Sequence, residues 1–256
     1  MTAKQKNNTN QNNEEHTTKE KEMTFFEHLG ELRKRILLSV AYILLFFMVS
    51  WAFVDKIYDW LSKPLLQFMP GGYKLAFTSL TEPFMMYVKI SFISGLFIAS
   101  PFVFYQLWRF ISPALYKKEK KFVVPFVFFT TLFFAAGGAF GYYYIFPWAC
   151  KFFLKIGENF QAIITIEQYF DLAFRVLLGI AVVFELPVLS FLLAKLGVLT
   201  AGFLLRNFKY AVVIIFIIAA VITPTPDMIT QSLFALPMMA LYLLSILIAK
   251  VVGPKD

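Results

Sequence analysis

Charge is scarce in this chain of 256 residues, since only 16% of them are Asp, Glu, Lys or Arg. Soluble domains usually carry about 25% charged residues, whereas apolar residues reach 59% here. A soluble core of this length does not hide so much apolar surface from water. The composition therefore excludes an ordinary soluble protein and indicates that lipid is the main solvent.

Cysteine and histidine are also rare: the chain has one Cys, Cys150, and two His, His16 and His28. A single cysteine excludes an intramolecular disulfide and a cysteine-based metal cluster. The sequence contains no G-x-S-x-G, no H-E-x-x-H and no phosphate-binding G-x-x-x-x-G-K-[ST] motif. We therefore expect no enzyme activity, no metal and no other cofactor.

The first 22 residues are mostly Lys, Asn, Gln, Thr and Glu, and almost none is apolar. Such a segment does not bury enough surface to offset its ordering entropy, so a disordered tail is expected at 1–22 and a membrane domain at 23–256. No signal-peptide core precedes residue 36, and the tail has acidic residues and no Arg. These features favour a prokaryotic plasma membrane over an organellar transit peptide.

Six apolar stretches predict a polytopic all-α fold. The uncharged run Ile36–Val54 has 19 residues, close to the ~20 needed to cross the hydrocarbon core. The run Phe122–Cys150 is 29 residues long, so we expect it to tilt and to continue into a loop at Pro147. The predicted spans are about 36–54, 84–108, 122–146, 172–194, 210–222 and 228–249.

The fifth stretch is short. Its apolar run, Ala211–Ile222, has twelve residues and reaches only ~18 Å as a helix. The prolines of the following segment, Thr-Pro-Thr-Pro-Asp at 223–227, prevent a straight helix through it. Two alternatives remain: a hairpin of short helices, or a protein that thins the bilayer locally.

Loop charges predict the orientation. With six spans and the N-terminus inside, 17 of the 24 Lys and Arg residues fall in inside segments and five in outside loops. This bias predicts that both termini are cytoplasmic. The formal charge of +8 is explained by these short basic loops, so nucleic-acid binding is not expected.

The segment before the first span predicts an amphipathic helix on the inner surface. Thr24 and Glu27 fit a capping box at its start. Two interpretations of Glu31 remain open. The plain one is an i,i+4 ion pair with Arg35, and the other is a contact with a cationic ligand.

The first inner loop is short, aromatic and basic. Glu119 is its only carboxylate and is surrounded by lysines. One interpretation is a surface acid that relieves the repulsion between them. The other is an anchor for a cationic ligand beside Phe110 and Tyr116, where arginine is favoured because guanidinium binds carboxylates bidentately and stacks on aromatic rings.

Glu185 is the one charged residue of the run Val176–Ala194. An ionisable group near the middle of a span is costly and either pairs with another helix or lines a polar cavity. Thr230 and Gln231 are candidate partners. Asp227 is expected to be the N-cap of the last helix.

Small residues in the third span form a GxxxG pattern at Gly137 and Gly141. Such a pattern lets two helices approach closely in lipid. Close helix packing is the expected role of both glycines.

Four segments of this sequence closely resemble the TatC family of twin-arginine protein translocases. They are HLGELRKR at 28–35, SPFVFYQLWRFISPALYKKE at 100–119, FELP at 184–187 and TPTPD at 223–227 followed by Gln231. Each alone is a weak signal, but four in order at matching span boundaries are specific. The resemblance covers Phe25 to about Ile248 and has one departure, an extra residue in the hairpin, where Thr-Pro-Pro-Asp is more usual.

This resemblance implies six tilted helices in a cupped arrangement, with the fifth and sixth spans short. It implies that the inner face recognises the paired arginines of signal peptides on folded precursors, with Glu31 and Glu119 as arginine contacts and Arg33 and Phe110 in the same surface. It places Glu185 and Gln231 in a polar intramembrane groove. Pro64 and Asp227 belong to the outer loops and hairpin.

The resemblance also implies partners and an energy source. These are the single-span subunits TatA and, where present, TatB, the precursor proteins, and further copies of the chain; transport is driven by proton-motive force. A small-solute secondary transporter is the main alternative, since Glu185 lies within a span near a proline, but internal repeats typical of that class are not seen. An intramembrane protease comes third, because the spans offer no catalytic pair.

Overall fold

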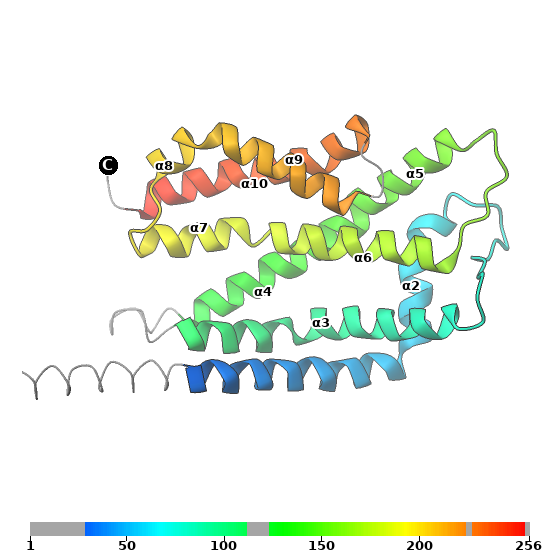
Figure 1. Cartoon of the computed structure of the whole chain (residues 1–256), viewed down its shortest axis with the longest axis horizontal. Helices are drawn as coiled ribbons and strands as arrows, with labels where there is room; N and C mark the ends of the chain where they lie inside the picture. Colours follow the sequence, from blue (N-terminus) through cyan, green and yellow to red (C-terminus); the bar gives the residue numbers. More distant parts are fainter. Residues whose placement is uncertain (1–28, 112–122, 224–226, 254–256) are drawn as a thin grey trace, which may run out of the picture.

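The computed structural model describes residues 29–111, 123–223 and 227–253, and helices dominate these ranges (Figure 1). After the first helix, Leu29–Ala52, the elements are α2 (Val54–Leu66), α3 (Glu82–Ile111), α4 (Val123–Phe140), η3 (Gly141–Ile145), α5 (Phe146–Ile156), α6 (Ile166–Val183), α7 (Leu186–Lys195), α8 (Ala201–Arg206), α9 (Phe208–Ile222) and α10 (Met228–Val252). The all-α prediction is confirmed. The capping box predicted at Thr24 and Glu27 lies outside the described residues.

Five of the described helical segments are long and apolar enough to cross a membrane, and α9 is shorter, at 15 residues. The prediction of a short fifth span is therefore confirmed. The prediction of a short sixth span is wrong, because α10 has 25 residues. No charge interrupts its sequence before Lys250, and the helix continues through Pro237.

Lipid exposure is clearest in the first helix, where only 6% of the most apolar 18-residue window is buried inside the protein. Large apolar side chains point outward along its whole length, including Leu37, Leu44 and Met48. In water this surface would be unfavourable by about 25 cal/mol per Å². The helix is therefore stable in this position only with lipid or a partner around it.

Glycines mark two close helix crossings. A Cβ on Gly95 of α3 would lie 2.7 Å from the backbone nitrogen of Phe47 in the first helix. A Cβ on Gly137 of α4 would lie 2.8 Å from the Cα of Ala181 in α6, and Gly141 faces the same helix. The packing role predicted for Gly137 and Gly141 is confirmed.

The third span is one tilted rod from Val124 to Ile156, 33 residues long, which crosses the molecule diagonally in Figure 1. The predicted loop at Pro147 is wrong, since Pro147 lies in the first turn of α5. A proline is tolerated at this point because the preceding turn, η3, is a π-helix, whose i→i+5 bonding shifts the hydrogen-bond register. A helix of this length must tilt to fit the bilayer, as expected.

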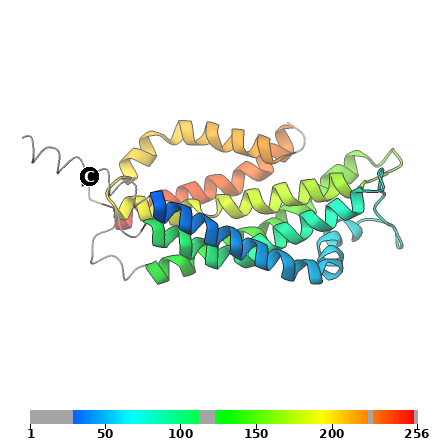
Figure 2. The ribbon, with the colours of Figure 1, turned by 60° about the horizontal axis from the view of Figure 1, so that its bottom comes forward.

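The long helices lie side by side, with the first helix and α9 farthest apart. Figure 1 places the first helix at one edge beside α3 and α9 at the other edge; in Figure 2 the first helix comes to the front and α9 stays at the edge. Helix α10 packs against both α7 and α9, and α4 packs between α3 and α6.

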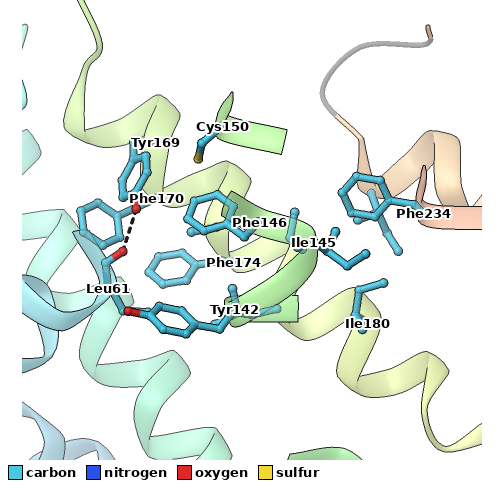
Figure 3. Close-up of a cluster of buried hydrophobic side chains, with 14 of the residues drawn as sticks. Leu61, Tyr142, Ile145, Phe146, Cys150, Tyr169, Phe170, Phe174, Ile180 and Phe234 are labelled. Carbon is cyan, nitrogen blue, oxygen red and sulfur yellow. Dashed lines mark hydrogen bonds between the residues drawn. The ribbon is translucent and has the colours of Figure 1, made fainter. Parts of the chain in front are cut away.

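The core lies where α2, η3, α5 and α6 meet, and aromatic rings fill most of it (Figure 3). Phe146 and Phe170 are fully buried there. The hydroxyl of Tyr169 donates to the Leu61 carbonyl of α2 at 2.7 Å. This contact attaches α2, which lies across the ends of the long helices, to the rest of the fold.

Candidate functional site

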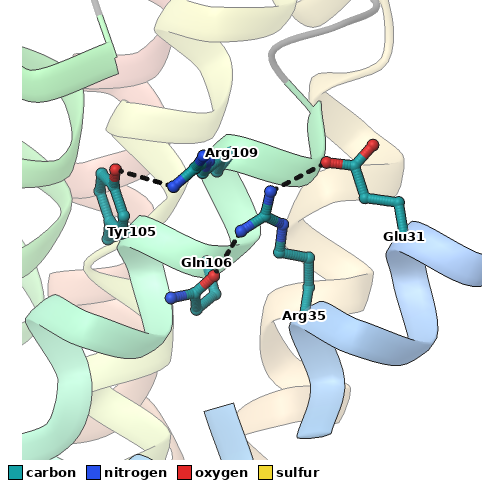
Figure 4. A network of polar contacts seen from close by, with 5 residues as sticks. All are labelled: Glu31, Arg35, Tyr105, Gln106 and Arg109. Atoms are coloured by element: carbon teal, nitrogen blue, oxygen red, sulfur yellow. Dashed lines mark hydrogen bonds and ion pairs between the residues drawn. The ribbon is translucent and has the colours of Figure 1, made fainter. Parts of the chain in front are cut away.

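Glu31, predicted to lie on the inner face, belongs to a small polar network between the first helix and α3 (Figure 4). Nη2 of Arg35 donates to Oε1 of Glu31 at 3.0 Å, and Nη1 donates to Oε1 of Gln106 at 3.0 Å. The Arg35 side chain is 13% exposed and that of Glu31 is 33% exposed. The i,i+4 pair predicted as the plain interpretation of Glu31 is thus present, and its carboxylate also faces solvent.

Phe110 and Arg109 stand at the C-terminal end of α3, beside this network. Phe110 is half-buried, and Nη1 of Arg109 lies 3.5 Å from the hydroxyl of Tyr105. Arg33 is exposed on the first helix. The structure therefore brings Glu31, Arg33 and Phe110 to the same end of the molecule, while Glu119 and Tyr116 lie outside the described residues.

Glu185 occupies the break between α6 and α7. Pro187 has no backbone N–H to bond the carbonyl four residues earlier, so the α6 helix ends at Val183 and α7 starts at Leu186. The side chain of Glu185 is buried, and its Oε1 has no hydrogen-bond partner among the described residues.

The candidate partners suggested for Glu185 bond elsewhere. Nε2 of Gln231 donates to the Phe216 carbonyl of α9 at 2.8 Å, and the Thr230 hydroxyl donates to the Asp227 carboxylate. That pairing is therefore wrong, because both side chains satisfy backbone or capping groups of the α9–α10 hairpin instead.

An apolar groove begins two residues after Glu185. It has a volume of about 360 Å³ and lies between α4, α7 and α10. Its lining is Pro125, Phe126, Phe129, Phe133, Pro187, Val188, Phe191 and Ile248. A carboxylate and an apolar groove thus lie next to each other within the span.

Asp227 is the N-cap of α10, as predicted. Its Oδ1 accepts a hydrogen bond from the Thr230 backbone N–H at 2.8 Å. With the Gln231 contact to α9, this fixes the start of α10 against its neighbour. The extra hairpin residue, in the segment 224–226, lies outside the described residues.

Pro64 has a structural effect that follows directly from its missing N–H. The carbonyl of Trp60, four residues earlier in α2, has no helical donor. The hydroxyl of Tyr142 donates to it at 2.5 Å, and the two rings stack with centroids 3.9 Å apart. Pro64 therefore allows α2 to bond η3, because it leaves the Trp60 carbonyl without a helical donor and free to accept from Tyr142.

With this geometry in place, the comparisons with known proteins are informative. The family model "Sec-independent protein translocase protein (TatC)" matches residues 27–237. A TatC protein of Koribacter versatilis is 46% identical over 92% of this chain and 88% of its own length, and one of Helicobacter pylori strain 26695 is 46% identical over 89% and 87%. A crystal structure of the twin-arginine translocase receptor TatC superposes with a TM-score of 0.79 at 35% identity, covering 88% of this chain and 99% of that one.

The chain belongs to the TatC family. It is accordingly a multi-pass membrane protein and a component of a protein translocase. The family resemblance read from the four sequence segments is confirmed.

Sequence reasoning missed two polar residues that position parts of this TatC-family fold. Gln106, only 4% exposed, is the second acceptor for Arg35. Glu82, only 7% exposed, accepts from the backbone N–H groups of Thr78 at 2.6 Å and Glu167 at 3.0 Å, which ties the start of α3 to the start of α6. Their signal was present in the sequence, because Gln106 is the lone amide near the end of the apolar run Ile90–Trp108 and Glu82 is the last polar residue before the first apolar stretch of α3.

Proposed function

We propose that this chain is the receptor and assembly platform of a twin-arginine translocase. The twin arginines of a signal peptide bind at the end of the molecule that carries Glu31, Arg33 and Phe110, with Glu119 as a further arginine contact. The proposal is supported by family membership and by the crystal structures whose proteins are described as twin-arginine translocase receptors.

The observation that carries the proposal is that Glu31 already holds a guanidinium group. Nη2 of Arg35 lies 3.0 Å from Oε1 of Glu31, and the Glu31 side chain is still one-third exposed. An arginine of the signal peptide competes with Arg35 for the carboxylate oxygens of Glu31, because its guanidinium group offers the same planar N–H donors. Arg35 keeps its bond to Gln106 when Glu31 turns to the ligand. Glu119, on the segment that follows Phe110, supplies the second carboxylate.

The orientation belongs to this proposal. The basic residues Arg35, Arg109, Lys195 and Lys250 end or begin helices at the same end of the molecule (Figure 1). The positive-inside rule places that end and both termini in the cytoplasm of a prokaryotic cell.

The membrane part of the proposal rests on Glu185 and the adjoining groove. The apolar stretch of the signal peptide lies against this region, and the single-span subunits TatA and, where present, TatB assemble on the same platform, with further copies of the chain. Gln231 and Asp227 hold the α9–α10 hairpin at the start of α10, and Pro64 holds α2 at the outer end. Proton-motive force drives transport.

Binding of a synthetic twin-arginine signal peptide to the detergent-purified protein tests the receptor function. We expect the twin-lysine peptide to bind at least about tenfold more weakly, because lysine does not form the bidentate pair. Glu119→Ala should weaken the twin-arginine peptide by about tenfold or more, since a hydrogen bond to a charged group contributes about 1.5–3 kcal/mol.

Glu158→Ala is the matched control, because Glu158 is an exposed carboxylate after α5, at the opposite end of the molecule. It should leave both peptides unaffected. Equal binding of the two peptides to the wild-type protein would contradict the receptor proposal.

A further inference from the structure

A second hollow lies at the α2 end of the molecule, away from the proposed peptide site. It is an apolar groove of about 540 Å³ between α2, α3, α4 and α6, and Ile93, Phe97 and Ala135 are among its lining residues. The surfaces of α3 and α4 beside it expose Phe92, Ile98 and Leu132, which indicates that it opens at the depth of the lipid chains.

A more polar hollow of about 450 Å³ lies next to this groove. Trp60 and Tyr143 line both hollows, so the two are adjacent, and the second is completed by Lys63, Pro64, Gln67, Tyr142 and Pro147. An apolar groove thus adjoins a hollow that carries a lysine, Lys63, and an amide, Gln67. Tryptophan and tyrosine at the junction are the residues that favour the boundary between lipid chains and headgroups.

Lys63 is exposed and forms no ion pair with any residue that the structure describes. Asp59, one turn earlier on α2, does not line either hollow. Helix α2 lies across the ends of the long helices (Figure 1), with its buried face on Leu61 and Leu65, so it is placed as an interfacial helix. The positive charge therefore faces the headgroup layer.

The π-helical turn η3 shapes the junction. It buries Tyr142 against Trp60 and leaves Tyr143 61% exposed beside the groove. Gly138, one turn earlier, leaves room for the ring of Phe97, since a Cβ there would lie 2.5 Å from it. Both features place aromatic rings in the walls of the two hollows.

We propose that this combined hollow binds one anionic glycerophospholipid, with an acyl chain in the groove and the phosphate at Lys63. The apolar lining of the groove and the basic lining of the adjacent hollow match the chain and the headgroup of such a lipid. A free phosphate lacks the apolar part, and a zwitterionic lipid gains less from the lysine.

Native mass spectrometry of the delipidated full-length protein tests this assignment. We expect palmitoyl-oleoyl phosphatidylglycerol to bind about fivefold more tightly than the matching phosphatidylcholine, since one lysine near a charged headgroup contributes about that factor. Lys63→Gln should abolish the preference, and Ala135→Trp, which fills the groove, should weaken both lipids. Glycerol phosphate should not bind.

Lys56→Gln, an exposed lysine on the same helix, and Ala136→Trp, an exposed neighbour outside the groove, are the controls and should bind as the wild type does. A preference for phosphatidylglycerol that survives Lys63→Gln would overturn the proposal. Unchanged lipid binding by Ala135→Trp would also overturn it and leave the groove to a transmembrane helix of a partner. Competition by glycerol phosphate as strong as that by the lipid would reduce the site to a phosphate site and contradict the acyl-chain part.

Discussion

Glu119→Lys is expected to abolish export of twin-arginine precursors in cells whose only TatC protein is this chain. The change removes an attraction for the peptide arginines and adds a repulsion. A contacting charge pair near a protein surface contributes up to about 4 kcal/mol, so the affinity of the receptor for the signal peptide should fall by about 100-fold or more. Export is measured as the processed precursor outside the membrane, and immunoblotting checks that the variant is present.

Glu158→Lys is the control for this reversal, because it introduces the same charge change at the opposite end of the molecule. It should leave export near the wild-type rate. Unimpaired export by Glu119→Lys at normal protein levels would exclude Glu119 as an arginine contact.

Glu185→Leu is expected to raise the thermal stability of the purified protein and to impair export severely. The side chain is buried with an unpartnered Oε1, and an unsatisfied buried polar group costs about 1–3 kcal/mol. Leucine of similar size removes that cost. Export should fall because the polar group within the span is retained for contact with the peptide or a partner subunit.

Glu185→Gln separates the two effects, since its amide keeps hydrogen-bonding capacity without the charge. It should retain more export than Glu185→Leu. A lower melting temperature for Glu185→Leu would mean that Glu185 stabilises the fold. Full export by Glu185→Leu would contradict a functional role of Glu185 within the membrane.

Much of the fold was predictable because lipid imposes strong rules on sequence. Runs of uncharged residues predicted the long spans, and the twelve-residue run before the two prolines predicted the short helix α9. Helix α2 was missed, because it mixes charges with apolar residues and contains Pro64. The continuation through Pro147 was missed as well, since it depends on the π-helical register of η3, which local pattern does not reveal.

The candidate site was predictable only in its local part. The Glu31–Arg35 pair follows from helical spacing alone. The bond from Arg35 to Gln106 joins residues 71 positions apart, and it depends on how closely the first helix approaches α3 at Gly95. For the same reason the sequence offered wrong partners for Glu185, because the direction of a side chain at a helix break depends on tertiary packing.

Mapping where a bound signal peptide contacts the protein tests the central claim most directly. A twin-arginine peptide with a photoreactive group next to its arginine pair is bound to the wild-type protein, crosslinked by light and located by mass spectrometry. The account predicts crosslinks to residues 29–35 and 106–121. Crosslinks confined to α2 or to the segment 157–165, at the opposite end of the molecule, would contradict it.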